Sequence, residues 1–167
     1  SAPGWNREHV WPKSLGGFET SGPGADILHI RPDDVTTNSD RGNKKFGNVT
    51  DGTASTATIT GANDALGGYY SSSYYEPLDS VKGDVARICL YVYMGYGSSY
   101  SRCGDLTNVF ESTDVLLQWM QKDPVDTWEM GRNEVAQAIQ GNRNPFVDYP
   151  EYAWLLLGQS VPTGYVT

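Results

Sequence analysis

The sequence contains little cysteine and little histidine. It has two residues of each type among 167, too few cysteines for a framework of disulfides. Cys89 and Cys103 have neither the spacing of a metal motif nor a histidine nearby. Two interpretations stay open for them. They pair with each other if the protein is secreted, or Cys89 is a small apolar residue buried in a helix and Cys103 is free or partly exposed.

Long apolar runs are absent as well. No stretch approaches the roughly 18 apolar residues of a membrane-spanning helix, so we expect no membrane segment. With 38% hydrophobic residues, 5 Trp and 11 Tyr, the composition is that of a folded globular protein. The length predicts a single domain over residues 1–167, and we expect a monomer. We interpret Ser1-Ala2-Pro3-Gly4, without an initiating Met, as a processed or trimmed start from which targeting information has been removed.

The excess of basic charge that is typical of nucleic-acid-binding proteins is also missing. The formal net charge is −8, which by itself argues against a nucleic acid partner. The charge is unevenly distributed, however. Residues 1–48 carry six basic and six acidic side chains, whereas the rest of the chain carries six basic and fourteen acidic ones. The neutral N-terminal part is therefore the part that a phosphate backbone can approach.

The N-terminal part predicts two strands. Residues 5–11 favour a strand, residues 13–24 are a Gly/Ser-rich loop, and the short apolar run at residues 26–30 fits a second strand. A helix is expected next. Asp33 or Asp34 would be its N-cap, and we expect it to run to about Lys45. The order strand, strand, helix is the first structural unit that the sequence predicts.

Residues 49–73 are rich in Gly, Ser, Thr and Ala, which predicts an exposed surface insertion with an edge hairpin at residues 56–60. Apolar residues then recur at helical spacing. Four further helices are expected, from Asp79 to about Tyr93, from Ser112 to Lys122, from Asp126 or Thr127 to Gly141, and from Tyr149 to Leu157. The predicted fold class is α+β, with the small strand–strand–helix motif wrapped by about four additional helices.

The segment Asn6-Arg7-Glu8-His9-Val10-Trp11-Pro12 places a carboxylate beside an imidazole. On an extended strand, Glu8 and His9 point to opposite faces, so that one can hold a metal while the other faces a substrate. Histidine is the commonest general base, and the oxygens of Glu8 and Asn38 suit a hard cation such as Mg²⁺. These parts fit phosphodiester hydrolysis. A zinc-protease motif is excluded, because no second histidine lies one helical turn from His9 and Pro12 prevents that helix.

Several ordered motifs together resemble the endonuclease I family. They are the segment from Asn6 to Pro12, His29-Ile30-Arg31-Pro32, Asn38 followed by Arg41-Gly42-Asn43, Lys82 to Arg87, Asp123 to Asp126, Trp128-Glu129, and Gln140 to Phe146. The resemblance covers nearly the whole chain except residues 49–73 and the loop at 95–110. Members of this family are secreted or periplasmic non-specific nucleases with the His-Me finger (ββα-metal) fold. The resemblance implies that fold as the core of this chain.

Matched by position, the resemblance implies that His9 is the general base and that Glu8 and Asn38 are the two protein ligands of a divalent cation. The expected cation is Mg²⁺, with Ca²⁺ or Mn²⁺ as alternatives. The resemblance also implies cleavage of DNA, and often of RNA, to 5′-phosphate and 3′-hydroxyl ends. Because family members usually have residues ahead of the Glu-His motif, we expect an N-terminal part of the family to be missing here.

Four other residues are candidates near the site. In the family an arginine steadies the phosphate and the leaving group. Arg41 and Arg31 are candidates for that role, and a salt bridge on the helix surface or at its cap is the alternative for either. His29 stands where family members commonly have two adjacent histidines, so we interpret it as a structural or supporting hydrogen-bonding residue. We interpret Asn43 mainly as structural, tying the helix to the strand.

The sequence therefore predicts a secreted or periplasmic, metal-dependent endonuclease that contacts the sugar–phosphate backbone of DNA, or of RNA, without sequence specificity. Its rival is a non-catalytic binding module in which Glu8 and Asn38 hold a structural Ca²⁺ and the acidic, tyrosine-rich surface binds a carbohydrate or a protein. A third interpretation, a phosphatase or another phosphoesterase, differs from the first only in its substrate.

Overall fold

The structure, a computed structural model, describes residues 4–59 and 65–165. It begins with a strand–strand–helix unit. Strand β1 (Trp5–His9) pairs antiparallel with β2 (Ile30–Asp34), and helix α2 (Val35–Arg41) follows β2 directly. In this pairing Glu8 lies opposite Arg31. The predicted order of elements is confirmed, and it sets the Glu-His pair beside the helix that carries Asn38.

The prediction of a strand at residues 26–30 was wrong, because β2 begins only at Ile30. The backbone N–H groups of His29 and Ile30 both donate to the carbonyl oxygen of Asp26, and the Asp26 side chain accepts from the N–H of Leu28. The segment is therefore a turn. Its two central side chains, Leu28 and His29, are both buried, whereas successive residues of a strand would point to opposite faces.

Helix α2 has the predicted cap and an unpredicted end. The Asp34 carboxylate accepts from the N–H groups of Thr36 and Thr37 at the helix start. The helix was predicted to reach Lys45 but ends at Arg41, where Gly42 takes a φ of 52° and its N–H donates to the carbonyl of Asn38. A positive φ of this kind suits glycine. The chain turns there and enters the next strand.

A second sheet covers the other side of α2. Its strands are β3 (Lys45–Phe46), β4 (Thr53–Thr56), β5 (Leu66–Tyr70) and β6 (Tyr74–Pro77), in the spatial order β3-β6-β5-β4. A hairpin with β4 at the edge of the sheet is present, but its strands lie almost entirely outside the predicted residues 56–60, because β4 ends at Thr56 and β5 begins at Leu66. Residues 60–64 lie outside the described part of the chain. The segment predicted as an insertion thus supplies two of the four strands.

The remaining elements are helical. The helices are α1 (Lys13–Gly16), α3 (Lys82–Tyr96), α4 (Thr113–Lys122), α5 (Thr127–Gln140), α6 (Pro145–Asp148) and α7 (Tyr152–Leu156), and single 3-10 turns lie at Gly22–Ala25, Asp79–Val81, Ser101–Gly104 and Leu106–Asn108. Asp126, one of the two predicted candidates, is the N-cap of α5, and Gly141 ends that helix as predicted. Ser112, the predicted start of α4, is its N-cap. The last predicted helix, from Tyr149 to Leu157, is present as the shorter α7, and α6 was not predicted. The α+β class is confirmed.

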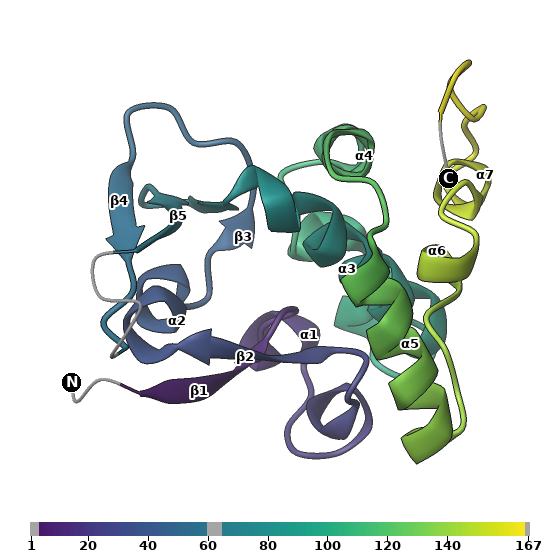
Figure 1. The fold of residues 1–167 in the computed structure, drawn as a ribbon, viewed down its shortest axis with the longest axis horizontal. Helices are drawn as coiled ribbons and strands as arrows, with labels where there is room; N and C mark the ends of the chain where they lie inside the picture. Colours follow the sequence, from purple (N-terminus) through teal and green to yellow (C-terminus); the bar gives the residue numbers. More distant parts are fainter. Residues whose placement is uncertain (1–3, 60–64, 166–167) are drawn as a thin grey trace.

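Helix α3 is the centre of the packing. Every residue from 86 to 92 is buried, as expected of a helix that is surrounded on all sides. Figure 1 shows the two sheets on one side of α3 and helices α5, α6 and α7 on the other. Cys89 and Cys103 are both free and buried. This agrees with the second interpretation, in which Cys89 is a buried residue of a helix and Cys103 is free. Within the described chain, no helix has the length and apolar character needed to cross a lipid bilayer.

Two polar clusters join α3 to its neighbours. The carboxylate of Asp26 accepts hydrogen bonds from the hydroxyls of Tyr91 and Tyr96 and from the amide of Gln140. This buried carboxylate ties the turn before β2 to two helices. Because each of its contacts supports the charged form, hydrogen bonding lowers the pKa of Asp26 although burial opposes it.

The second cluster surrounds Arg87, whose side chain is fully buried. Its guanidinium donates twice to the Glu129 carboxylate and once, at 2.9 Å, to the carbonyl of Asp123. Asp84 lies 3.4 Å from the same guanidinium. Burial, together with the charge and the hydrogen bond of Glu129, raises the pKa of Asp84 to about 7. Asp84 therefore holds a proton in the folded protein at a pH where it has lost it in the unfolded chain.

This arrangement predicts a pH-dependent effect of the substitution Asp84→Asn. A carboxyl group whose pKa is higher in the folded state stabilises the fold at low pH, and this stabilisation is lost as the pH rises from about 4 to about 7. Asparagine keeps the shape and a donor but does not titrate. We expect the variant to gain stability relative to wild type between pH 5 and pH 8, measured by thermal unfolding. A difference that is the same at both pH values would contradict the assignment.

Candidate active site

The end of β1 and one face of α2 enclose a cavity of about 360 Å³. Its lining includes five of the seven residues singled out from the sequence, namely Glu8, His9, Asn38, Arg41 and Asn43. Residues separated by some thirty positions in the chain therefore meet in one place. His29 and Arg31 do not line this cavity, and their contacts are described below.

His9 is held by the backbone of the preceding loop. Its Nε2 atom lies 3.1 Å from the carbonyl oxygen of Gly24. Since a carbonyl oxygen only accepts hydrogen bonds, this contact places the proton of the neutral ring on Nε2 and leaves the lone pair on Nδ1. The ring of Phe18 packs beside the imidazole, with 6.1 Å between ring centroids. One nitrogen is thus fixed while the other is left to act.

His29 is a buried support for His9. Its ring centroid lies 5.7 Å from that of His9. Its Nδ1 donates to the carbonyl of Pro23 at 2.7 Å, and its Nε2 accepts from the N–H of Trp11 at 2.8 Å. Burial lowers the pKa of His29 to about 4, so the ring is neutral at neutral pH. With both nitrogens engaged, His29 has the contacts of a structural residue.

Arg41 links Glu8 to the backbone of the strand. Its Nη1 donates to the Glu8 carboxylate at 2.7 Å and to the carbonyl of His9 at 3.3 Å, and its Nη2 donates to the carbonyl of Val10 at 2.7 Å. The guanidinium also lies 4.3 Å above the ring of Phe46. Arg41 is 2% exposed. A side chain so enclosed fixes the position of Glu8 and of the strand and presents little surface to a substrate.

The negative charge of the Glu8 carboxylate is only partly compensated by Arg41. Burial raises the pKa of Glu8 to about 7 against the attraction of Arg41, and the carboxylate of Asp33 adds to the rise. Arg41 contacts one oxygen of Glu8. A cation bound to the other oxygen would stabilise the ionised form of a group that burial destabilises.

Asn38 offers the second oxygen. Its side-chain nitrogen lies 3.4 Å from the carbonyl of Arg7, and its oxygen accepts no hydrogen bond from the residues that the structure describes. One carboxylate and one amide oxygen in an open cavity suit Mg²⁺, which keeps much of its water shell and takes few protein ligands. The described residues form no group of three or more His, Cys, Asp or Glu side chains that could hold a metal. A cation here would therefore depend on Glu8, Asn38 and water.

Arg31 and Asn43 differ in their surroundings. Arg31 donates through Nη1 to the carbonyls of Ile27, Leu28 and Ile30, so its charge is used to close the turn before β2. Burial lowers the pKa of Arg31 to about 9, and the charge of Arg132 adds to this effect. Asn43 is exposed at the rim of the cavity beside Gly42.

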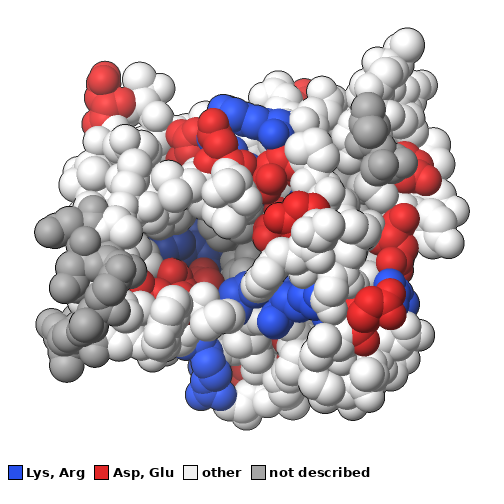
Figure 2. Space-filling model, in the orientation of Figure 1, with Lys and Arg blue, Asp and Glu red and all other residues white. Residues whose placement is uncertain are grey.

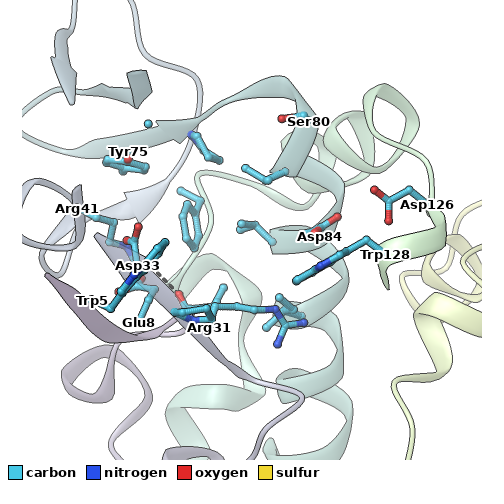
Figure 3. A pocket seen from close by; sticks show the side chains of 18 residues that line it. Trp5, Glu8, Arg31, Asp33, Arg41, Tyr75, Ser80, Asp84, Asp126 and Trp128 are labelled. Atoms are coloured by element: carbon cyan, nitrogen blue, oxygen red, sulfur yellow. Dashed lines mark hydrogen bonds and ion pairs between the residues drawn. The ribbon is translucent and has the colours of Figure 1, made fainter. Parts of the chain in front are cut away.

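A larger cavity of about 470 Å³ lies on the other side of the Glu8–Arg41 pair, and both of these residues line it as well. Figure 2 shows it as a hollow near the centre of the molecule with basic and acidic side chains inside. In Figure 3, Trp5, Arg31 and Asp33 lie on the wall formed by β1 and β2, and Asp84 and Trp128 lie across from them. The pair thus forms a partition between two cavities.

Sequence reasoning missed the groups that hold His9 in place. The carbonyl of Gly24 and the ring of Phe18 belong to a segment that was predicted as a loop. Glycine and a single aromatic residue in a loop carry no signal of this role, because the contact depends on the path of the backbone. Lys13, Ser14 and Glu19, which line the same cavity, were missed for the same reason.

Comparison with known proteins shows the family of this chain. Residues 1–151 match the family Endonuclease I. The chain belongs to this family. It is 46% identical over 160 residues to the extracellular ribonuclease of Bacillus subtilis (strain 168), and the match covers 89% of this chain and 52% of that protein.

Two further relatives extend the comparison. The extracellular ribonuclease of Bacillus amyloliquefaciens is 44% identical over 163 residues, which cover 89% of this chain and 52% of the relative. An extracellular deoxyribonuclease of Aeromonas hydrophila is 33% identical over 72 residues, which cover 43% of this chain and 28% of the relative. The chain spans about half the length of the two Bacillus proteins it matches.

The contacts of Arg41 predict a large loss of stability for Arg41→Ala in this Endonuclease I family member. Removing one partner of a buried ion pair leaves the carboxylate of Glu8 uncompensated, which costs about 3–5 kcal/mol. Urea unfolding at pH 8, above the pKa of Glu8 in the wild type, measures the effect, because without Arg41 the buried carboxyl must either stay charged without a partner or take up a proton. Arg7→Ala is the matched control, because Arg7 is exposed in the same cavity and should change the free energy of unfolding by at most about 0.5 kcal/mol. Similar losses for both variants would refute the role given to Arg41.

Proposed function

We propose that this chain is a metal-dependent endonuclease that hydrolyses phosphodiester bonds of DNA and RNA, built on a His-Me finger core. The observation that carries the proposal is the state of His9. One of its nitrogens is bound to a backbone carbonyl, the other has no hydrogen-bond partner among the residues that the structure describes, and Glu8 lies next to it in the same open cavity. Membership of the Endonuclease I family supports the same reaction.

In the proposed mechanism, His9 acts as the general base. Its Nδ1 takes the proton from an attacking water molecule, while Nε2–H keeps its hydrogen bond to the carbonyl of Gly24. That carbonyl also stabilises the positive charge that the ring acquires. Phe18 and His29 both pack beside the ring and restrict its movement, which helps the lone pair of Nδ1 to keep its direction. Arg41 acts as a positioning residue, because it binds both the side chain of Glu8 and the carbonyl of His9.

We propose that Glu8 and Asn38 hold one divalent cation, with Mg²⁺ as the first candidate and Ca²⁺ or Mn²⁺ as alternatives. When bound, such a cation offsets the negative charge that develops on the phosphate and on the leaving oxygen. The residues fit this task because both ligands are oxygen atoms and because burial leaves the charge of Glu8 incompletely compensated.

The substrate is proposed to be recognised through its backbone. Phosphate contacts carry no sequence information, and the cavity offers cationic and amide groups instead of a closed base-sized slot. Relatives of this chain are named as extracellular ribonucleases and as an extracellular deoxyribonuclease, which supports action on both nucleic acids and secretion of the protein. We propose that it acts as a monomer.

The first test compares His9→Ala with Glu8→Gln in a plasmid-cleavage assay, with Mg²⁺ or with EDTA. His9→Ala should lower turnover by at least about 10²-fold and retain cation binding, measured with Mn²⁺ by calorimetry. Glu8→Gln should lose both. A His9→Ala variant that cleaves as fast as the wild type would refute the proposed mechanism. A well-folded wild type that binds Ca²⁺ without cleaving either nucleic acid would favour the binding module.

The second test concerns the ends of the products. Because water is the proposed nucleophile, the 2′-hydroxyl of RNA takes no part in the reaction. An RNA oligonucleotide with a single 2′-deoxynucleotide on the 5′ side of the cut should therefore be cleaved at that position about as fast as unmodified RNA. Mass spectrometry should find 5′-phosphate and 3′-hydroxyl ends. A 2′,3′-cyclic phosphate among the products would show that the mechanism is wrong.

A further inference from the structure

A third cavity, of about 460 Å³, continues the one at His9. It is lined by Lys13, Ser14, Gly16, Gly17, Glu19, Ser99, Tyr100, Ser101 and Arg102. Lys13, Ser14 and Glu19 line both cavities. A chain molecule that passes His9 would thus find a continuous path along α1 and the turn at residues 101–104.

The charge along this path is unusual for the molecule. The continuing cavity has two cations, Lys13 and Arg102, against the single carboxylate of Glu19. The 470 Å³ cavity instead has four carboxylates against two guanidinium groups, and another, of about 570 Å³, has three carboxylates against Lys82. In a chain with a net charge of −8, a cation-rich path beside the proposed base is a local reversal of sign.

The fold holds these cations at the surface. The Nη1 atom of Arg102 donates to the carbonyl of Ser14 at 3.0 Å, which leaves other N–H groups of the exposed guanidinium available. A side chain at Gly17 would crowd this arginine, since a Cβ atom there would lie 3.3 Å from Cδ of Arg102. The ammonium of Lys13 lies 3.6 Å from the carboxylate of Glu19, whose side chain is 86% exposed. Glu19 is thus a negative group placed where a phosphate would compete for Lys13.

We propose that this cavity is a second phosphate-binding subsite, in which Arg102 and Lys13 bind the backbone of a polynucleotide next to the phosphate that is cleaved. The inference rests on the proposed function, because it needs a nucleic acid strand at His9. Exposed cations bind phosphates by releasing counterions, so each contact contributes to the salt dependence of binding. Glu19 opposes binding by like-charge repulsion and by its pairing with Lys13.

The test measures binding without cleavage, in the His9→Ala background. Fluorescence anisotropy follows a single-stranded RNA 20-mer and, separately, a duplex DNA 20-mer over a range of salt concentrations. Arg102→Gln should weaken binding about fivefold and reduce the slope of log K against log salt by about 0.7–0.9. Glu19→Gln should strengthen binding by a similar factor. An effect on one nucleic acid alone identifies which backbone uses the subsite.

Two controls separate charge from structure. Arg102→Lys keeps the charge and should retain most of the affinity, whereas equal weakening by Arg102→Lys and Arg102→Gln would show that only the contact with Ser14 matters, which would overturn the proposal. Lys122→Gln removes an exposed cation that pairs with Asp79 and should leave both the affinity and the slope unchanged. If the wild type cleaves nucleic acid but Arg102→Gln binds normally, the subsite is refuted alone. If the wild type does not cleave, the proposed function fails first.

Discussion

The site depends on the hydrogen bonds that the buried guanidinium of Arg41 makes. It binds the carboxylate of Glu8 and the carbonyls of His9 and Val10 at the same time. One side chain at the end of α2 thereby fixes three consecutive residues at the end of β1. The ββα unit is small, with five-residue strands and a seven-residue helix. An element of this size has little apolar area of its own, so a charged contact of this kind sets the position of the strand relative to the helix.

A buried pair of this kind stabilises less than its Coulomb attraction suggests, because both groups lose water. The raised pKa of Glu8 reflects that cost. The benefit of the pair is that it fixes the orientation of Glu8, since a guanidinium has donors in fixed directions. The ring of Phe46 below the guanidinium and the packing of Phe46 on Trp119 extend the same restraint into the main core. The rigidity of the site is therefore connected to the packing of the second sheet and α4.

Local sequence signals predicted much of this fold. The caps at Asp34 and Asp126 were each predicted as one of two neighbouring candidates, because the side chain that caps a helix is encoded at the cap itself. The turn at residues 26–30 was predicted wrongly as a strand. Leu28 is buried in the main core, and Asp26 accepts hydrogen bonds from Tyr91, Tyr96 and Gln140. Such long-range partners leave no trace in a short sequence window.

In the candidate site, too, some features could be predicted from local sequence and others depend on long-range contacts. Glu8, His9 and Asn38 were chosen by residue type and by resemblance, and the structure brings them to one cavity; their roles stay predictions. The burial of Arg41 and the use of Arg31 to close a turn could not be predicted, because the sequence does not say whether an arginine faces solvent or backbone. Gly24 was unpredictable for a simpler reason. It contributes a carbonyl group, which every residue has.

The partition formed by Glu8 and Arg41 also separates two cavities of different chemical character. The polar cavity at His9 opens toward the cation-rich path, while the larger hollow behind it is lined mostly by apolar side chains such as Val10, Phe46 and Ile88. A small apolar molecule in that hollow would touch the far side of the same carboxylate without entering the path of a polymer. The carboxylate of Glu8 thus faces a polar cavity on one side and a more apolar one on the other.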